Sequence, residues 1–255
     1  CVVKQRHTDI ASRIASIIGA QPDSYNYFAE QETAGKCLEW VRDHLAKDEI
    51  NLYLDKHSVV DDPESGYRSM YDFLIESIEQ IPPASNGVIF TPWLHGNRSP
   101  FEDSNARGIF FNLGLDTGKR AMIRAVVEGI IFHQKWLLES IEHRFIVNEP
   151  LRFVGGGALS PSMTQIMADI LGKPVLSVEH PQNCGAAGAA FCAAIALGKL
   201  SDFRQVKQCI PTSRTSLPDS THQNSYTQQF KVFKELYTRN KKLFHLLNAT
   251  ADSKR

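Results

Sequence analysis

The sequence lacks an excess of either charge, because 28 Lys and Arg residues balance 28 Asp and Glu residues. This balance removes the electrostatic argument for binding nucleic acid or a membrane surface. Cysteine is scarce, with 5 residues in 255, and neither a Cys-x-x-Cys pair nor a His/Cys metal spacing occurs. The odd number of cysteines and their mostly apolar neighbours predict reduced, buried thiols and a cytoplasmic location.

Long hydrophobic runs are also absent. The least polar segment, Cys184–Gly198, is shorter than the about 20 residues that a membrane-spanning helix needs. The chain begins without a charged leader or an apolar signal core, so we expect no targeting segment and no membrane partner. A chain of 255 residues can bury a sizeable core as one large or two small domains.

Apolar spacing predicts the order of helices and strands. The expected helices are Asp9–Ile18, Ala34–Leu45, Tyr67–Ile78, Lys119–Glu142, Met163–Leu171, Cys184–Leu197 and Phe230–Leu247. The expected strands are Tyr25–Glu30, Val88–Phe90, Ile109–Leu113, Phe153–Val154 and Pro174–Val178. The Ala/Gly-rich helix Cys184–Leu197 is expected to pack tightly on a sheet, and Thr212–Ser220 to form a polar linker.

Three consecutive glycines, Gly155–Gly157, connect a predicted strand to a predicted helix. Without Cβ atoms a ligand can approach the main chain, and the helix N-terminus offers free N–H groups. Such a turn suits a nucleotide, but it equally suits close helix–strand packing. A dinucleotide fold is a third interpretation, with Glu179 as the ribose-binding carboxylate, although Ser160 occupies the position of the third glycine.

Three blocks of sequence, in this order along the chain, carry a resemblance to a known family. The first is AGKCLEW at 34–40. The second joins TPWLHGNRSP at 91–100, ARGIFFNL at 106–113 and RAVVEG at 124–129. The third joins FVGGGA at 153–158, ADILGKPV at 168–175 and GAAGAA at 185–190. Together they resemble the C-terminal part of the FGGY carbohydrate kinases, and most of all the xylulokinase branch.

This resemblance implies an α/β domain of the actin-like ATPase type, related to ribonuclease H, with a mixed sheet flanked by helices. It implies that residues 1–211 form most of the ATPase domain and that 212–255 form a linker and a terminal helix. The implied ligands are ATP and Mg²⁺, and the implied reaction transfers the γ-phosphate to a sugar hydroxyl, with xylulose expected. Carried over to this chain, the nucleotide site comprises Gly35, Glu39, Gly156, Gly157, Ala158 and Pro161.

The chain departs from the family pattern in what it lacks. Asn112 and Ala121 replace a usual glycine and a polar residue, and Pro161 stands near a position that often reaches the adenine. The family's base aspartate lies in a G-D-N type motif, and no such motif precedes Gly35. We therefore expect no catalytic residue here, no activity of the chain alone, and sugar binding only with a first domain present.

Two other classes of function stay open at this point. The chain could be a non-catalytic module that binds a nucleotide or a partner, or a dinucleotide-dependent oxidoreductase domain. A face normally covered by a first domain would be apolar, so we expect a homo-oligomer, a missing N-terminal half, or self-association. The loop 92–107 could border a sugar or phosphate, although ion pairs within an ordered loop are the favoured interpretation. Glu128 is expected to be either buried and paired or solvent-facing, rather than catalytic.

Overall fold

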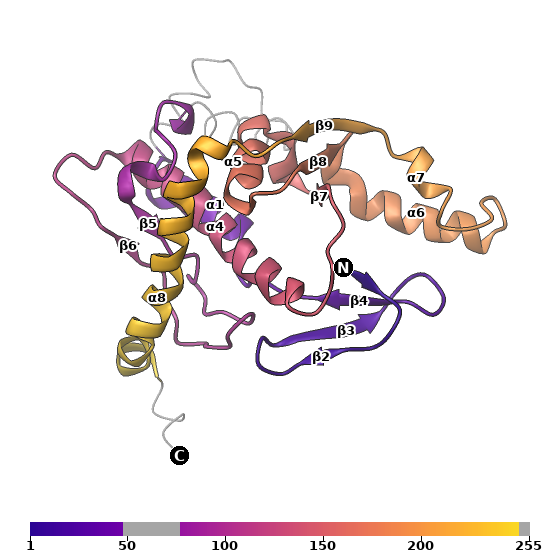
Figure 1. Ribbon diagram of the computed structural model, residues 1–255, viewed down its shortest axis with the longest axis horizontal. Coiled ribbons are helices and arrows are strands. Elements are labelled where there is room, and N and C mark those ends of the chain that lie inside the picture. Colours follow the sequence, from indigo (N-terminus) through magenta and orange to yellow (C-terminus); the bar gives the residue numbers. More distant parts are fainter. Residues whose placement is uncertain (48–76, 250–255) are drawn as a thin grey trace.

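The computed structural model describes residues 1–47 and 77–249 of the chain. Figure 1 shows a helix-rich body, from which a sheet of strands β1–β4 and the helix α6 extend on the same side. The helices are α1 Gly35–His44, α4 Lys119–Glu142, α5 Pro161–Leu171, α6 Cys184–Ala196, α7 Val206–Cys209 and α8 Gln223–Asn248. The strands are β1 Val2–Val3, β2 Thr8–Asp9, β3 Ile14–Ile18, β4 Tyr25–Phe28, β5 Ile89–Phe90, β6 Phe110–Phe111, β7 Leu151–Phe153, β8 Val175–Val178 and β9 Thr212–Ser216.

The described strands form three separate sheets. The first has the order β1-β4-β3-β2 and the second pairs β5 with β6. The third has the order β7-β8-β9, in which β7 and β8 are parallel and β9 is antiparallel to β8. The β7–α5–β8 crossover brings the carboxyl ends of two parallel strands to one edge, where α/β folds place their ligands.

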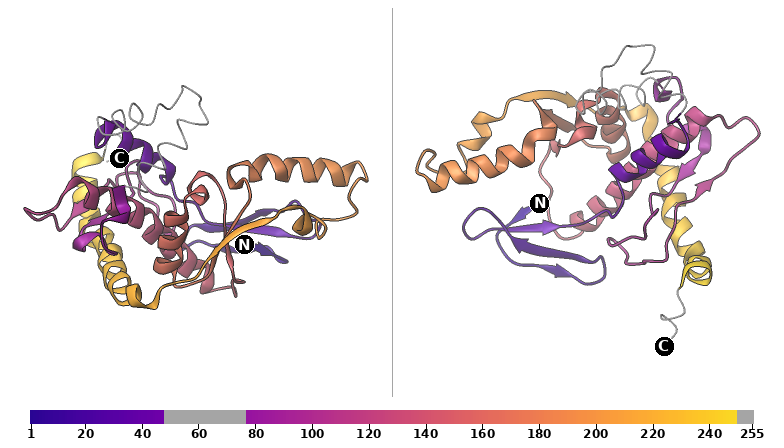
Figure 2. Two further views of the ribbon diagram at one scale, coloured as in Figure 1. Left: turned by 90° about the horizontal axis from the view of Figure 1, so that it is seen from above. Right: turned by 180° about the vertical axis from the view of Figure 1, so that it is seen from behind.

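The long helix α4 is the centre of the body (Figures 1 and 2), and the strand β5 and the helices α1, α5 and α8 pack against it. Its apolar positions join a core of buried side chains that includes Phe90, Trp93 and Phe233. The core also contains an ion pair, since Arg124 Nε lies 2.8 Å from Glu128 Oε1 and both side chains are buried. Glu128 is therefore buried and paired, which is one of its two expected placements.

A buried charge needs several partners, and Glu128 has them. Its carboxylate accepts hydrogen bonds from the Ala84 amide at 3.1 Å, the Ser85 hydroxyl at 2.6 Å and the Tyr226 hydroxyl at 2.9 Å. These donors come from the 3₁₀ turn η1 (Ser85–Gly87), its preceding residue and α8. The group therefore ties three parts of the chain together.

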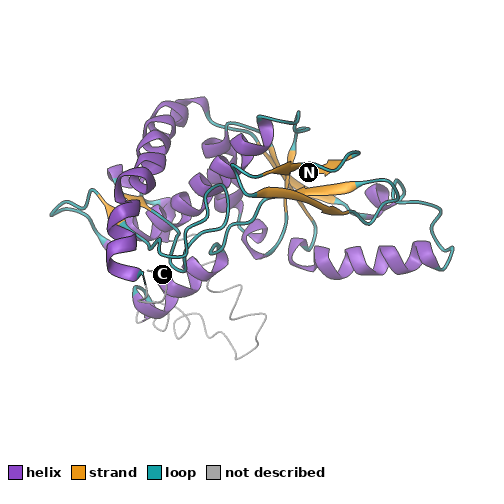
Figure 3. Cartoon of the chain, turned by 90° about the horizontal axis from the view of Figure 1, so that it is seen from below, coloured by secondary structure: helices purple, strands orange, loops and turns teal. Residues whose placement is uncertain are grey.

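The buried apolar residues fall into two clusters rather than one. The larger surrounds α4, and the smaller consists of Val3, Ile14 and Tyr27 from the sheet β1–β4, with Phe145 and Ile141 packed against it. A small domain usually has a single contiguous core. Figure 3, viewed from below, shows the sheet β1–β4 beside the helical body rather than inside it.

The expected helix Asp9–Ile18 is wrong, because β2 and β3 form a hairpin there. The Asp9 carboxylate accepts bonds from the Ala11 and Ser12 amides, and Arg13 has φ 54°, so the segment turns. Of its isoleucines only Ile14 is buried, while Ile10 is 74% exposed. Isoleucine at helical spacing here reflects β-propensity rather than one buried helix face.

Two further expectations need correction. Thr212–Ser216, expected within a polar linker, forms β9 on the edge of the third sheet, and α8 begins at Gln223, before the expected Phe230. Helix α6 has the expected bounds within one residue, but none of its side chains is buried. It therefore does not pack tightly on a sheet in this chain.

Three remaining expectations concern one predicted helix, the cysteine thiols and membrane-spanning helices. The expected helix Tyr67–Ile78 lies, apart from its last two residues, outside the described residues. Only Cys37 is a buried thiol, and its burial raises its pKa to about 12, whereas Cys1, Cys192 and Cys209 are exposed. The expectation of mostly buried thiols is therefore wrong. Within the described residues no helix is both long and apolar enough to cross a bilayer.

Candidate functional site

The glycine turn leaves β7 and enters α5 through the 3₁₀ turn η2 (Gly156–Leu159). Gly155 has φ 93° and ψ −177°, a conformation that is essentially restricted to glycine. A Cβ atom on Gly155 would meet no atom within 4 Å. The backbone therefore requires glycine at this position, and the space outside it is open to a ligand.

The turn is fixed by contacts with the end of the neighbouring parallel strand. The Gly155 amide donates to the Pro181 carbonyl at 2.9 Å, and the Ser177 hydroxyl donates to the Ala158 carbonyl at 3.1 Å. Pro181 opens the 3₁₀ turn η3 (Pro181–Asn183), which follows β8. This second turn was not among the residues that the sequence predicted for the site. The predicted order of strand, helix and strand over 153–178 could have indicated it, because that order is typical of parallel strands whose carboxyl ends meet at one edge.

Gly155 and Gly157 differ in what surrounds the position of a Cβ atom. A Cβ on Gly157 would lie 2.9 Å from Phe153 Cζ and 3.3 Å from Met163 Cε, so it would point into packed side chains. Ala158 is also buried. These two positions therefore serve helix–strand packing, and a ligand would reach mainly the main chain of Gly155 and Gly156.

The N-terminus of α5 is less open than the sequence suggested. The Ser160 hydroxyl caps the helix by accepting from the Met163 amide at 3.1 Å, and Pro161, the first helical residue, has no amide hydrogen. Pro161 is exposed beside the turn. Fewer free N–H groups remain for an anion than an uncapped helix would provide.

Gly35 and Glu39 lie on α1, which packs against α4. Gly35 is the first residue of that helix, and a Cβ atom there would meet no atom within 4 Å. The Glu39 carboxylate accepts from Lys36 Nζ at 2.7 Å on the surface. Among the described residues no hydrogen bond joins α1 to the glycine turn. Gly156, Gly157, Ala158 and Pro161 thus lie together in the connection from β7 to α5, whereas Gly35 and Glu39 lie on α1.

The loop 92–107 is held by polar contacts with residues outside it. His133 Nε2 lies 2.8 Å from the Ser99 carbonyl, and the Trp93 indole N–H donates to His133 Nδ1 at 3.3 Å. Burial lowers the pKa of His133 to about 4, so the ring is neutral and satisfied at neutral pH. On the surface, Arg98 Nη1 lies 2.9 Å from the Glu30 carboxylate. The loop is ordered as expected, but the expectation of ion pairs within it is wrong: its ion pairs join it to residues outside the loop, and Arg107 donates instead to the Ser104 and Ala106 carbonyls.

The carboxylates do not gather into a metal site. Within the described residues, no group of three or more His, Cys, Asp or Glu side chains is placed to hold a metal ion.

Residues 4–197 match the C-terminal domain of the FGGY family of carbohydrate kinases. The chain belongs to this family.

Curated relatives of this FGGY chain include kinases for two different sugars or sugar acids. Xylulose kinase of Bacillus subtilis (strain 168) is 25% identical over 241 residues, which are 94% of this chain and 44% of that kinase. Gluconokinase of Bacillus licheniformis is 29% identical over 203 residues, covering 78% of this chain and 37% of that kinase. The expected resemblance to the FGGY C-terminal domain and its xylulokinases is confirmed.

Solved structures support the fold of the FGGY chain. Ligand-bound xylulose kinase from Lactobacillus acidophilus superposes with a TM-score of 0.78 at 24% identity, covering 96% of this chain and 46% of that one. Plasmodium falciparum glycerol kinase with ADP gives 0.66 at 20% identity, covering 87% and 41%. The chain thus has the expected actin-like ATPase fold, and it spans less than half the length of these relatives.

Proposed function

We propose that this chain is the ATP-binding part of a carbohydrate kinase, which transfers the ATP γ-phosphate to a hydroxyl of xylulose. The observation that carries this proposal is the open turn at Gly155, at the carboxyl end of a parallel strand in an FGGY domain. Adenosine would lie on the main chain of Gly155 and Gly156, with Pro161 and the turn after β8 at its sides. No G-D-N type motif precedes Gly35 in the sequence, so we expect transfer to need further parts of the kinase.

Mg²⁺ fits this proposal as a ligand of the nucleotide rather than of the protein. The described residues provide no carboxylate cluster near the turn, and Mg²⁺ commonly binds substrate phosphates while keeping several waters. Bound in this way it would neutralise phosphate charge during transfer. In the assembled kinase, this chain would contribute by positioning the nucleotide.

Gluconate is the second candidate substrate. Gluconokinases match this chain at 29% identity, against 25–28% for the three leading xylulose kinases. The identity values therefore favour neither sugar, whereas the xylulose kinases of Bacillus subtilis and Staphylococcus epidermidis are matched over more of the chain, 94% against 78%. An assay of the assembled kinase with both substrates would separate the two candidates.

Titration calorimetry tests the nucleotide site. The whole chain should bind ATP with Mg²⁺ and not NAD, and Gly155→Ala should weaken ATP binding by about tenfold, equivalent to about 1.4 kcal/mol. Gly172→Ala is the matched control, because Gly172 also has positive φ, at 68°, but caps the other end of α5. An equal loss of ATP affinity in both variants, or tighter binding of NAD than of ATP, would contradict the proposal.

The same preparation tests inactivity of the chain alone. We expect no xylulose- or gluconate-dependent ADP release, since loss of a positioned general base costs about 10²–10⁴-fold and sugar binding is expected only with a first domain present. Sugar-dependent ADP release by the purified chain would show that the missing residues are not required.

A further inference from the structure

The last two turns of α8 carry apolar side chains that the core does not use. Leu243, Leu246 and Leu247 are 54%, 77% and 81% exposed. The side of α8 that packs in the core is formed by other residues, namely Tyr226, Gln229, Phe230, Phe233, Leu236 and Phe244. Leucines three and four positions apart lie on one side of a helix. The three exposed leucines therefore form a second apolar strip on the outside of α8, which we call the leucine ridge.

The leucine ridge is held in place at the surface of the molecule. On the same turns of α8, His245 Nδ1 lies 3.4 Å from Asn105 Nδ2, and the Asn248 side chain donates to the Asn105 carbonyl at 3.0 Å. These contacts tie the end of α8 to the loop 92–107. Figures 1 and 2 show this end of α8 projecting from the body on the side away from α6.

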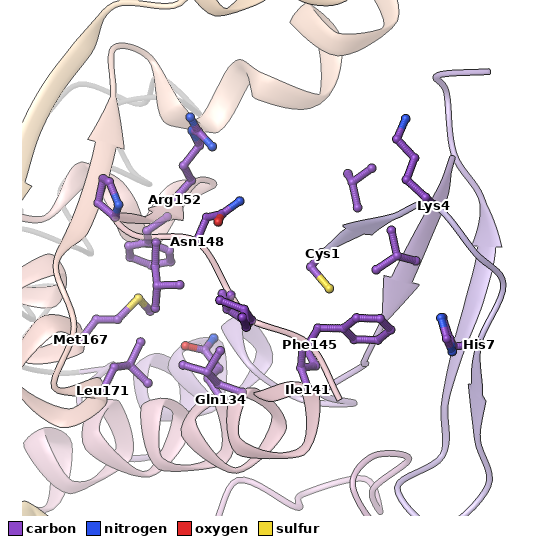
Figure 4. Close-up of a pocket in the computed structure, with 18 of the residues that line it drawn as sticks. Cys1, Lys4, His7, Gln134, Ile141, Phe145, Asn148, Arg152, Met167 and Leu171 are labelled. Atoms are coloured by element: carbon purple, nitrogen blue, oxygen red, sulfur yellow. The ribbon is translucent and has the colours of Figure 1, made fainter. Parts of the chain in front are cut away.

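The leucine ridge is also separate from the large cavity of the chain. That cavity, of about 1000 Å³, lies between β1 and β7, and Figure 4 shows Lys4 on one of its walls and Arg152 on the other. Its described lining includes no residue of α8. Whatever fills this cavity in the assembled kinase would therefore leave the leucine ridge uncovered.

The charge around the leucine ridge is positive, although the whole chain is neutral. Helix α8 contains five Lys or Arg residues and a single acidic residue, Glu235. Glu235 is already paired, since Arg239 Nη2 lies 2.7 Å from its carboxylate. Lys241 and Lys242, directly before the leucines, are exposed. The balance of charge over the whole chain thus hides a local basic surface that adjoins exposed leucines.

This charge distinguishes between the possible occupants of the leucine ridge. A second copy of the chain would bring lysines against lysines, which is unfavourable. A groove in a protein partner would have to enclose α8, whose other side is buried in the core, whereas a flat surface meets the ridge alone. Leucines beside Lys and Arg are typical of helices that lie on anionic membranes. Charge and shape together therefore favour an acidic lipid surface.

We infer that the leucine ridge docks this chain onto an anionic membrane surface. Leu243, Leu246 and Leu247 would enter the boundary between headgroups and acyl chains, while Lys241 and Lys242 contact acidic headgroups. Such docking is reversible, because so few apolar side chains bind far more weakly than a spanning helix. The inference goes beyond the proposed kinase function and does not depend on nucleotide binding.

Vesicle flotation of the whole chain tests this inference. The chain should float with phosphatidylcholine vesicles that contain about one-third phosphatidylserine, and much less with phosphatidylcholine alone. Raising the salt from about 0.1 M to about 1 M shortens the Debye length from about 10 Å to about 3 Å and should lower the bound fraction severalfold. Equal binding to both kinds of vesicle would indicate a contact through uncharged apolar surface such as α6, and would overturn the inference.

Two matched double variants locate the contact. Lys242→Glu with Leu246→Ser alters the leucine ridge and should weaken binding to the anionic vesicles by at least about tenfold. Arg214→Glu with Leu217→Ser makes the same kind of change at exposed positions of β9 and the residue after it, and should leave binding unchanged. Because all four side chains are exposed, both variants should keep the thermal midpoint of the chain. Equal losses of vesicle binding in the two variants would contradict docking through the ridge.

A tryptophan on the leucine ridge reports insertion directly. Leu246→Trp should add fluorescence that brominated acyl chains quench, since an indole ring settles at the membrane interface. Leu217→Trp is the control and should add fluorescence that these lipids do not quench. Binding of soluble poly-glutamate as tight as that of vesicles, without quenching in Leu246→Trp, would indicate an acidic protein partner. That result would overturn the membrane inference, whatever the result with ATP.

Discussion

At the scale of single residues, the buried pair Arg124–Glu128 gives the sharpest prediction. Arg124→Met should lower the free energy of unfolding by about 3–5 kcal/mol, because it leaves a buried carboxylate without its counter-charge and removes the donor to the Ile78 and Ile81 carbonyls. The measurement is urea unfolding.

The matched control is an arginine–glutamate ion pair at the surface. Arg239 pairs with Glu235 at the same i, i+4 spacing, but both side chains are more than half exposed. Arg239→Met should therefore cost only about 0.3–0.5 kcal/mol. Similar losses in the two variants would mean that burial does not decide the strength of this pair.

The residue scale also shows what sequence reasoning can and cannot supply. The helical pattern around Glu128 predicted that it is not catalytic, but it left a buried pair and a solvent-facing side chain equally open, and the burial of Arg124 and Glu128 decides for the pair. The role of Gly157 was not, because the three glycines are equivalent in sequence, and only the backbone shows that Gly155 needs its positive φ while Gly157 faces Phe153. Gly157→Val would therefore disturb the packing against Phe153 and Met163.

At the scale of elements, two mid-helix glycines should respond in opposite directions to alanine. Gly188→Ala in α6 should stabilise the helix by about 0.5–1 kcal/mol, since alanine has the better helix propensity and the site is open. Gly129→Ala in α4 should destabilise the protein by about 1–3 kcal/mol, because its Cβ would clash with the Phe90 carbonyl oxygen. Far-UV circular dichroism during urea unfolding measures both changes in the free energy of unfolding. An unchanged free energy of unfolding in Gly129→Ala would contradict the close packing of α4 on β5.

Elements with a strong apolar period were predictable, and those decided by tertiary pairing were not. The bounds of Lys119–Glu142 match α4 because its apolar face is long and regular. The hairpin β2–β3 was mistaken for a helix because its isoleucines fall at helical spacing, and β9 for a linker because its serines and threonines signal polarity rather than pairing. The exposure of α6 depends on what lies outside the chain, which its apolar sequence cannot show.

At the scale of the whole molecule, the exposed apolar surface should cause self-association. It comprises α6 and the outer face of the sheet β1–β4, where Ile17 is 53% and Val2 is 62% exposed. The mean mass from light scattering should therefore rise with protein concentration. Replacing Ala189 by Glu and Ala193 by Lys, both on the unburied helix α6, should reduce that rise.

A surface change elsewhere serves as the control for association. Thr227→Glu places a charge opposite Lys231 on the exposed side of α8 and should leave association unchanged. A monomer at every concentration would show that the exposed α6 and sheet do not attract each other. All samples need a thiol reductant, because the exposed Cys1, Cys192 and Cys209 could otherwise link copies covalently.

The two clusters of buried side chains have a consequence for cooperativity. Val3, Ile14 and Tyr27 hold the sheet β1–β4 together with few partners, whereas the cluster around α4 draws on four helices. We therefore expect two thermodynamic units of unequal size, in which the sheet opens while the helical body stays folded. A single unfolding midpoint describes only the larger unit, and a two-state equation applied to the whole signal would understate its stability.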